Sequence, residues 1–555
     1  MRVTLVRQGR TFRYQLHPES DDPAEGRRKF EDCPTPFRLV RRGYRVVVPS
    51  SFRWIHPDTH ALAIWHAIGP VVGSRLDLPF ETSPDLAQWL IKNRGPRLAR
   101  VGERQRPRRR PRAPAPALLF SGGMDSMAAS LLLPAQTHHL FLDRIPHPSP
   151  AQDGLVDLKR QRAACTAVRA AGRPVHRTAD DHEYLFEPYP MWHSDMAPLS
   201  ALYLADSLGL GTLDTGNVLD CMYFGGYHPG QREHWRMKPL EQPADSGRGI
   251  GLETANSIGG LSEVATTAIV ARSRHRGKSF SCYYPADGAF CLRCDKCFKK
   301  MILRHVADDE EVPESLFEHF LGMPHLAAIF TRPFFDWHHV WFYLFQRMRC
   351  RHWFAVELKK QAEKGPDLSV LEKWYPNAAN AMAGAYADVV RENIGRWVAT
   401  MSPSETRAFE QLDVPPLHAP ALTERRPRPA AGIAAPGSGP PRETTALFKL
   451  LSSKLTTRPP LRWGPYTLED ISLRARDPSV WLRLKADGDE IFMRLFRITQ
   501  PEDKYLVRAG CLGFAFDPHP PAQAAVRQAV RGVVSALADA QRELGRPRIK
   551  RHETL

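Results

Sequence analysis

The stretch SGGMDS, residues 121–126, has the residue types and order of a phosphate-binding turn. It follows the apolar run 118–120 and precedes residues 124–133, whose apolar side chains recur at helical spacing. A strand, a glycine-rich turn and a helix start gather backbone N–H groups at the positive end of the helix dipole, which suits a polyphosphate. Gly122 and Gly123 let the backbone approach closely, while Ser121 and Ser126 add hydroxyl donors. An ordinary strand-to-helix turn would explain SGG alone.

Asp125 adds a carboxylate to the same stretch. A carboxylate lies favourably beside phosphates only with a cation between them, so Asp125 predicts a magnesium ion. The stretch is not a Walker loop, because the chain lacks the G-x-x-x-x-G-K-[ST] pattern there.

A second motif is formed by Cys282, Cys291, Cys294 and Cys297, which have the spacing C-x8-C-x2-C-x2-C. Four thiolates at this density are typical of a tetrahedral zinc site. Four protein ligands leave no position for a reacting water, so the zinc would be structural. An iron–sulfur cluster takes the same ligands and remains an alternative.

The pattern around the first motif predicts an α/β domain. Apolar runs at 118–120, 138–143 and 211–217 have the length of buried parallel strands, and 198–210 has a helical pattern. Ligands of such sheets bind at the carboxyl ends of the strands. Asp143 and the Thr215-Gly216-Asn217 turn are therefore expected at the pocket. Cys221, beside that pocket, is either a nucleophile or a packing residue.

SGGMDS matches the SGG-x-D-S signature of the PP-loop ATP pyrophosphatases. Its combination with the cysteine motif resembles the layout of the 7-cyano-7-deazaguanine synthase family, over roughly residues 117–306. The resemblance implies an adenine nucleotide alpha hydrolase-like fold that cleaves ATP between its α and β phosphates, with Mg²⁺ close to Asp125. The residues it places around ATP are Phe120, Ser121, Gly122, Gly123, Asp125, Ser126, Asp143 and Gly216.

The resemblance also implies an ATP-dependent carbon–nitrogen ligase of queuosine biosynthesis. Such an enzyme adenylates a carboxylate like that of 7-carboxy-7-deazaguanine, releases pyrophosphate and lets ammonia or another nitrogen nucleophile displace AMP. Asp125, Ser126 and Glu263 are the expected catalytic residues, with Asp220 and His147 as further candidates. The family's Gly-Gln-Arg-His stretch is DRIPH here, residues 143–147, and its Lys-x-Glu is Leu-Ser-Glu, residues 261–263, so the acceptor stays open.

Two stretches rich in Pro, Ala and Arg divide the chain. We expect an N-terminal α+β module at 1–100, an Arg/Pro linker at 101–116, the parallel-sheet PP-loop domain with its zinc loop at 117–330, a helical extension at 331–413, a disordered linker at 414–445 and a C-terminal α+β module at 446–555. In the last module, 479–486 and 490–498 have strand patterns, and 445–455 and 522–544 have helical ones.

Composition limits the compartment and the partners that we expect for this chain. No apolar run approaches the roughly 18 residues of a membrane span, the N-terminus lacks a signal-peptide pattern, and the nine cysteines are not arranged as a disulfide framework, so we expect a cytoplasmic protein without a membrane partner. A net charge of +17 suits a nucleic-acid partner, although arginine-rich linkers are more commonly solvated tethers. The aromatic stretch 334–354 is either core or a base-stacking surface.

Other functions remain open at this stage. Synthase-like chains with added domains resemble components of antiphage defence systems, in which the family's chemistry is redirected to a macromolecule. The flanking domains and arginine-rich linkers would then contact a protein or nucleic-acid partner. A tRNA sulfurtransferase would use the same loop to adenylate a base, but it needs a persulfide or catalytic cysteine pair. A non-catalytic scaffold would keep only the nucleotide pocket.

Overall fold

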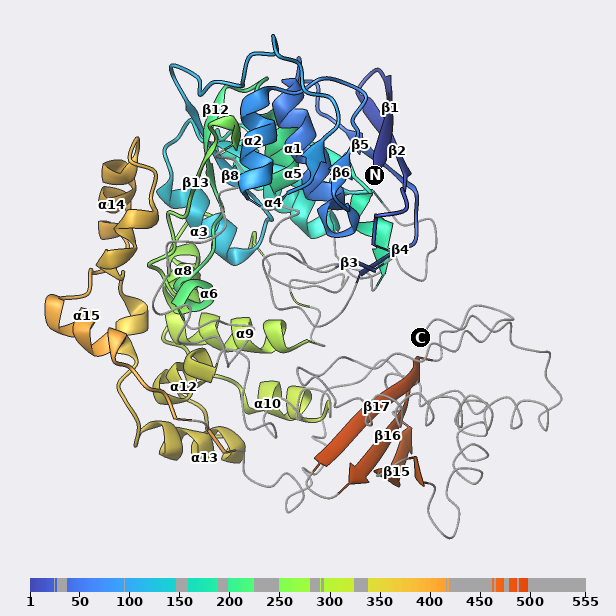
Figure 1. The fold of residues 1–555 in the computed structure, drawn as a ribbon. Helices are drawn as coiled ribbons and strands as arrows, with labels where there is room; N and C mark the ends of the chain where they lie inside the picture. Colours follow the sequence, from blue (N-terminus) through green and yellow to red (C-terminus); the bar gives the residue numbers. More distant parts are fainter. Residues whose placement is uncertain are drawn as a thin grey trace. The chain divides into compact units, whose positions relative to one another are not determined.

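The chain divides into two compact units, residues 1–426 and 427–555 (Figure 1). The structure is a computed structural model. It describes residues 1–23, 25–26, 37–93, 95–145, 158–187, 198–223, 249–279, 290, 294–323, 338–415, 417–418, 462–463, 466–473, 479–486 and 489–497.

The first unit is built on an eight-stranded sheet in the order β1-β2-β5-β10-β9-β8-β12-β13. The strands are β1 (Arg2–Gln8), β2 (Thr11–His17), β5 (Gly43–Val47), β8 (Ala115–Leu119), β9 (His138–Arg144), β10 (Val175–Asp180), β12 (Leu210–Asp214) and β13 (Glu253–Ala255). The run β10-β9-β8-β12-β13 is parallel, as the sequence predicted, whereas β5, β2 and β1 pair antiparallel. The fold is therefore α/β, with a mixed sheet.

Two smaller sheets belong to the same unit. One contains β3 (Glu25–Gly26), β4 (Phe37–Leu39) and β11 (Phe186–Glu187), and the other contains β6 (Arg75–Leu76) and β7 (Arg97–Leu98).

The α-helices described in the first unit are α1 (Pro57–Ile68), α2 (Pro84–Lys92), α3 (Met124–Leu132), α4 (Leu158–Ala170), α5 (Pro198–Leu204), α6 (Leu219–Tyr223), α8 (Glu263–Ala271), α9 (Asp295–Ala307), α10 (Glu314–Leu321), α12 (His338–Arg347), α13 (Trp353–Ala362), α14 (Ala387–Gly395) and α15 (Pro403–Glu410). Within the described part of the chain, no helix combines the length and the apolar character needed to cross a membrane.

Successive side chains of a strand point to opposite faces of the sheet, and in β8 the side chains on both faces are buried. Ala117 and Leu119 belong to a core with α1, α2 and α5, whereas Leu118 and the following Phe120 belong to a core with α3, α8 and α14. Helices therefore cover both faces of the sheet around β8, which fixes the position of the loop that follows it (Figure 1).

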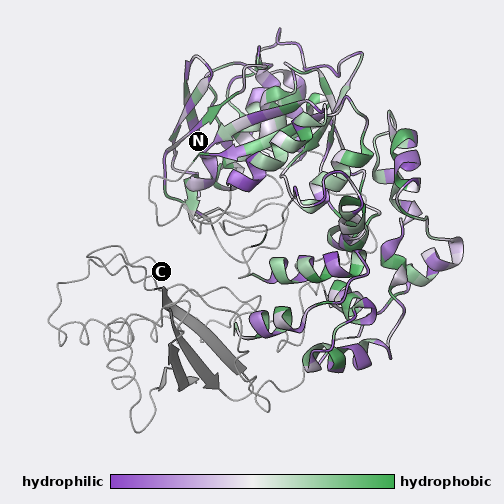
Figure 2. Ribbon diagram, turned by 180° about the vertical axis from the view of Figure 1, so that it is seen from behind, coloured by the Kyte–Doolittle hydropathy of each residue, from purple (hydrophilic) through white to green (hydrophobic). Residues whose placement is uncertain are grey.

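A third core lies among α9, α10, α12 and α13. The described part of the aromatic stretch lies in it: Trp341 and Phe345 are buried, and the Trp341 ring centroid lies 5.5 Å from that of Phe298 on α9. These side chains pack in the core and present no base-stacking surface. The helices carry both apolar and polar residues, as amphipathic helices do (Figure 2).

The N-terminal residues differ from the expected separate module. β5 pairs with β10, so β1, β2 and β5 extend the same sheet as the parallel strands. The predicted linker also belongs to the fold, because Arg108 is buried and its Nε lies 2.6 Å from Asp206 Oδ1. The sequence predicted an α+β module here but could not show that β5 pairs with β10 in the same sheet.

The second unit contains an antiparallel sheet in the order β14-β15-β16-β17, formed by β14 (Arg462–Trp463), β15 (Tyr466–Leu473), β16 (Ser479–Ala486) and β17 (Asp489–Arg497). The strands predicted at 479–486 and 490–498 correspond to β16 and β17, in which Ala486 pairs with Asp489. The helices predicted at 445–455 and 522–544 lie outside the described residues, as does most of the linker 414–445.

Candidate functional site

The SGGMDS loop connects the carboxyl end of β8 to α3, as predicted. Gly122 has a φ of +77°, and a Cβ there would lie 3.1 Å from Ala164 Cβ and 3.2 Å from Gln161 Cα, both in α4. Only glycine combines that backbone conformation with so close an approach. The glycine is thus explained by packing against α4 as well as by room for a ligand.

Hydrogen bonds hold the loop in place. Ser126 Oγ lies 3.1 Å from Ser121 Oγ and donates to Gly123 O over 3.1 Å, while Gly123 N donates to Ser121 Oγ over 3.3 Å. Gly123 is the N-cap of α3 and has no side chain with which to cap the first-turn N–H groups. The loop therefore presents backbone donors and the positive end of the α3 dipole at one point.

The loop lies at the switch point of the parallel strands, because β8 is flanked by β9 on one side and β12 on the other. Gly216, after β12, has a φ of +66°, and a Cβ there would lie 3.9 Å from Ser126 Cα. Buried Asp214 accepts hydrogen bonds from Gly216 N at 3.3 Å and Ser257 N at 2.9 Å, so it ties the ends of β12 and β13 together. Burial raises the pKa of Asp214 to about 6, although the hydrogen bonds from Ser257 and Gly216 oppose the shift.

Basic side chains from α9 lie beside the loop. Lys300 Nζ lies 2.9 Å from Glu263 Oε1 and 3.6 Å from Asp125 Oδ1, and Lys299 Nζ lies 2.6 Å from Glu263 Oε2. Thr266 Oγ1 donates to Asp125 Oδ1 over 2.7 Å. The side chain of Lys300 is 2% exposed and that of Asp125 is 32% exposed, so the network is buried on the lysine side and open at Asp125.

Electrostatics keep this network charged. Burial alone would lower the pKa of Lys300, but the carboxylates of Asp125 and Glu263 outweigh it and raise the pKa. Burial alone would raise the pKa of Glu263, but Lys299 and Lys300 outweigh it and lower the pKa well below its ordinary value. Burial, followed by the charge of Lys299, lowers the pKa of nearby Lys296 to about 8.

Glu263, an expected catalytic residue, is therefore the counter-ion of two lysines, which favours a positioning role over proton transfer. Asp220 has a similar structural role: it accepts from Glu263 N at 2.5 Å and lies 2.6 Å from His339 Nε2, so it joins α6, α8 and α12. His147 lies outside the described residues.

Two other expected binding residues are engaged elsewhere. The side chain of Phe120 is buried, with its ring centroid 5.3 Å from that of His139, so only its backbone lies at the loop. Asp143 lies near the carboxyl end of β9, as predicted, but its carboxylate pairs with Arg162 of α4 at 3.0 Å and with Arg177 of β10.

The cysteine motif is described only in part. Cys294 and Cys297 are buried at the start of α9, where Cys297 N donates to Cys294 Sγ over 3.4 Å, whereas Cys282 and Cys291 lie outside the described residues. No group of three or more His, Cys, Asp or Glu side chains within the described ranges could hold a metal ion. Cys221 is a poor nucleophile, because burial and nearby carboxylates, Asp220 first, raise its pKa to about 12.

The site residues expected from the sequence did not include Lys296, Lys299, Lys300 or Thr266. Their signal was present: positions 296, 299 and 300 share one helix face, in a helix that begins at the cysteines. This face did not indicate a site, because lysine side chains on a helix are normally solvated.

Residues 248–413 match the family described as Family of unknown function (DUF6395). The match begins after the SGGMDS loop and includes Glu263, all four motif cysteines, the three lysines and the helices through α15. No curated protein and no solved structure matches the chain.

Proposed function

We propose that the first unit binds ATP at the SGGMDS loop and cleaves it between the α and β phosphates to adenylate a carboxylate. One observation carries the proposal: the glycine-rich loop lies at the switch point of the parallel strands, with Lys300 beside Asp125. This arrangement supplies donors and positive charge where the leaving pyrophosphate develops negative charge.

Each group has a role in this proposal. The backbone N–H groups of the α3 start and the hydroxyls of Ser121 and Ser126 bind phosphate oxygens. Lys300 neutralises charge on the leaving pyrophosphate, and Glu263 fixes the position of Lys300. The partly exposed Asp125 carboxylate has the oxygen donors that Mg²⁺ prefers, so it would hold that ion, which supplies further charge neutralisation.

The proposed reaction has two steps. A carboxylate oxygen of the acceptor attacks the α phosphorus, the bond to the bridging oxygen breaks, and pyrophosphate leaves from an acyl adenylate. Ammonia or another nitrogen nucleophile then attacks the acyl carbon, AMP leaves, and the nitrogen loses a proton. Positioning and charge neutralisation suffice for the first step, because the carboxylate is already ionised at neutral pH. A 7-carboxy-7-deazaguanine-like acceptor follows from the sequence resemblance, and a macromolecular acceptor would suit a role in antiphage defence.

A structural zinc site is part of the proposal. Cys294 and Cys297 fit it, because both are buried, they are one helical turn apart, and a backbone N–H already points at Cys294 Sγ. The ion would fix the start of α9, the helix that carries Lys300. Purified protein should contain about one zinc per chain, measured by mass spectrometry of the metal, and Cys294→Ser should lose it; iron with inorganic sulfide would indicate a cluster instead.

The proposal is tested by measuring AMP and pyrophosphate released from ATP in the presence of 7-carboxy-7-deazaguanine and ammonia. We expect both products from the wild-type chain and their loss in Asp125→Ala. Asp388→Ala is the matched control, because it removes an aspartate that is 93% exposed on α14.

The other outcomes discriminate between functions. Release of AMP only with tRNA and a sulfur donor would identify a sulfurtransferase. Tight ATP binding without cleavage for any carboxylate, in protein with its metal, would overturn the proposal in favour of a nucleotide-binding scaffold.

A further inference from the structure

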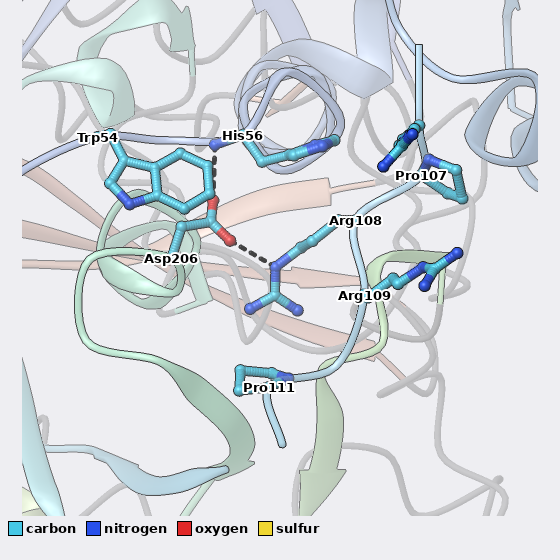
Figure 3. Close-up of a pocket in the computed structure, with 8 residues that line it drawn as sticks. Trp54, His56, Pro107, Arg108, Arg109, Pro111 and Asp206 are labelled. Atoms are coloured by element: carbon cyan, nitrogen blue, oxygen red, sulfur yellow. Dashed lines mark hydrogen bonds and ion pairs between the residues drawn. The ribbon is translucent and has the colours of Figure 1, made fainter. Parts of the chain in front are cut away.

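A pocket of about 270 Å³ opens at the opposite edge of the sheet from the SGGMDS loop (Figure 3). Trp54 and His56, just before α1, form one side, and Arg106, Arg108 and Arg109 come from the segment that enters β8. Asp206, shortly before β12, also lines it. The pocket therefore lies beside the amino ends of β8 and β12.

The inner side of the pocket is fixed by a buried ion pair. Arg108 Nε lies 2.6 Å from Asp206 Oδ1, and the other Arg108 nitrogens donate to Ile250 O at 2.5 Å and Leu210 O at 3.0 Å. Asp206 Oδ2 also accepts from His56 N over 2.7 Å, as Figure 3 shows. Because Arg108 and Asp206 neutralise each other, neither is left to attract a charged ligand.

The residues on the outer side of the pocket, Trp54, Arg106 and Arg109, are exposed, unlike the buried pair of Arg108 and Asp206. Trp54 is 53% exposed, a large apolar surface for a side chain beside a pocket. Arg106 and Arg109 are exposed, and neither forms an ion pair with any residue in the described ranges. The pocket thus combines an accessible indole ring with two unneutralised guanidinium groups.

We propose that this pocket binds a nucleotide of a single-stranded nucleic acid, with a base stacked on Trp54 and phosphates paired with Arg106 and Arg109. An indole face binds any base by stacking, and guanidinium groups pair with phosphate oxygens. Trp54 and Arg109 lie on opposite sides of the Arg108 side chain in the pocket, so a ligand that reaches both must extend across it (Figure 3). Neighbouring nucleotides on one strand meet that requirement.

The site is separate from the proposed ATP site. The five residues of β8 lie between the two, a separation of about 17 Å at roughly 3.3 Å per strand residue. The proposal therefore does not depend on adenylation, and ATP at the loop would not compete for this pocket.

The test is fluorescence anisotropy of a fluorescein-labelled oligo(dT) titrated with the full chain at several salt concentrations. Trp54→Ala should weaken binding at least about fivefold, and Trp54→Phe should restore most of it. The double variant Arg106→Gln/Arg109→Gln should weaken binding and reduce the slope of log affinity against log salt by about 1.4. Arg391→Gln/Arg396→Gln removes the same charge from exposed positions on α14 and at its C-cap. This control should leave both the affinity for oligo(dT) and the salt slope close to those of the wild type.

Two further arms identify the source of the ligand. Thymidine monophosphate should compete only at much higher concentration than unlabelled oligo(dT), and Asp125→Ala should bind the strand as the wild type does. Equal affinity of the wild type, Trp54→Ala and the double arginine variant, each confirmed as folded by circular dichroism, would overturn the proposal, as would equal competition by the free nucleotide.

Discussion

A buried cation lies at each end of the parallel strands, at the carboxyl edge and at the amino edge of the central sheet, but the two have different surroundings. At the carboxyl edge, Lys300 lies between the carboxylates of Glu263 and Asp125, and Asp125 remains partly exposed. At the amino edge, Arg108 pairs with buried Asp206, and its remaining nitrogens bind backbone carbonyls. The lysine belongs to a network that is open on one side, whereas the arginine belongs to a closed one.

This difference explains what each edge can do. A charge network that remains partly exposed can be completed by a ligand, since the exposed Asp125 carboxylate can hold a cation to which phosphate oxygens also bind. A closed network gains nothing from a ligand and instead fixes the chain, here the segment that leads into β8. Any ligand at the amino edge must therefore bind the exposed residues around Arg108.

Lys300→Met should be the most damaging change, because it leaves the buried Glu263 carboxylate with Lys299 as its remaining ion-pair partner among the described residues. We expect unfolding in urea to show a loss of about 3–5 kcal/mol, together with loss of ATP binding. Adding Glu263→Gln should recover part of the stability but none of the ATP affinity. Lys364→Met, on an exposed position after α13, is the matched control. Normal ATP affinity in a folded Lys300→Met variant would contradict the claim that the partly exposed network around Lys300 takes part in ATP binding.

Arg108→Met should have a smaller effect, because Asp206 keeps its hydrogen bond from His56 N. We expect a loss of about 3 kcal/mol in urea unfolding, from the unpaired carboxylate and the two unpaired carbonyls. Arg108→Lys should be almost as harmful, since one ammonium cannot reproduce the three contacts of the guanidinium. Arg110→Gln, which removes a half-exposed ion pair with Glu253, should cost less than about 1 kcal/mol. ATP binding by folded Arg108→Met should be unchanged; its loss would show that the two edges are coupled.

His139 gives the smallest effect and is a buried base that has no carboxylate partner among the residues that the structure describes. Its ring nitrogens lie 2.7 Å from Ser130 Oγ and 3.0 Å from Thr137 O, and burial, followed by the charge of Arg173, lowers its pKa to about 3. The folded chain then binds fewer protons than the unfolded chain below the unfolded pKa of about 6.5. Stability should be unaffected by this residue above pH 6.5 and should fall by about 1.4 kcal/mol per pH unit as the pH falls from 6.5 toward 3.

His139→Gln should remove that part of the acid sensitivity, measured as the difference in urea-unfolding free energy between pH 7 and pH 5.5. If the variant and the wild type lost the same stability between pH 7 and pH 5.5, protonation of the buried imidazole would not destabilise the folded chain. A buried base in this sheet would then not need a carboxylate partner to carry charge.

The sequence predicted much of the local structure around the loop. The strands at 118–120, 138–143 and 211–217 correspond to β8, β9 and β12, and the SGGMDS turn lies between β8 and α3. These predictions succeeded because apolar runs and glycine-rich turns are determined by neighbouring residues. The pairing of β5 with β10 is set by contacts between residues far apart in the chain, so no local pattern revealed it.

By itself, then, the sequence determined the glycine-rich loop, the strand and helix that flank it, and the cysteine spacing, because each depends on residues close together in the chain. Only the tertiary structure decided the partners of the charged groups. It brought Lys300 of α9 to Asp125 of α3, and Arg108 of an apparent linker to Asp206. A buried charge is stable only with a partner, and in this fold the partners are supplied by distant segments.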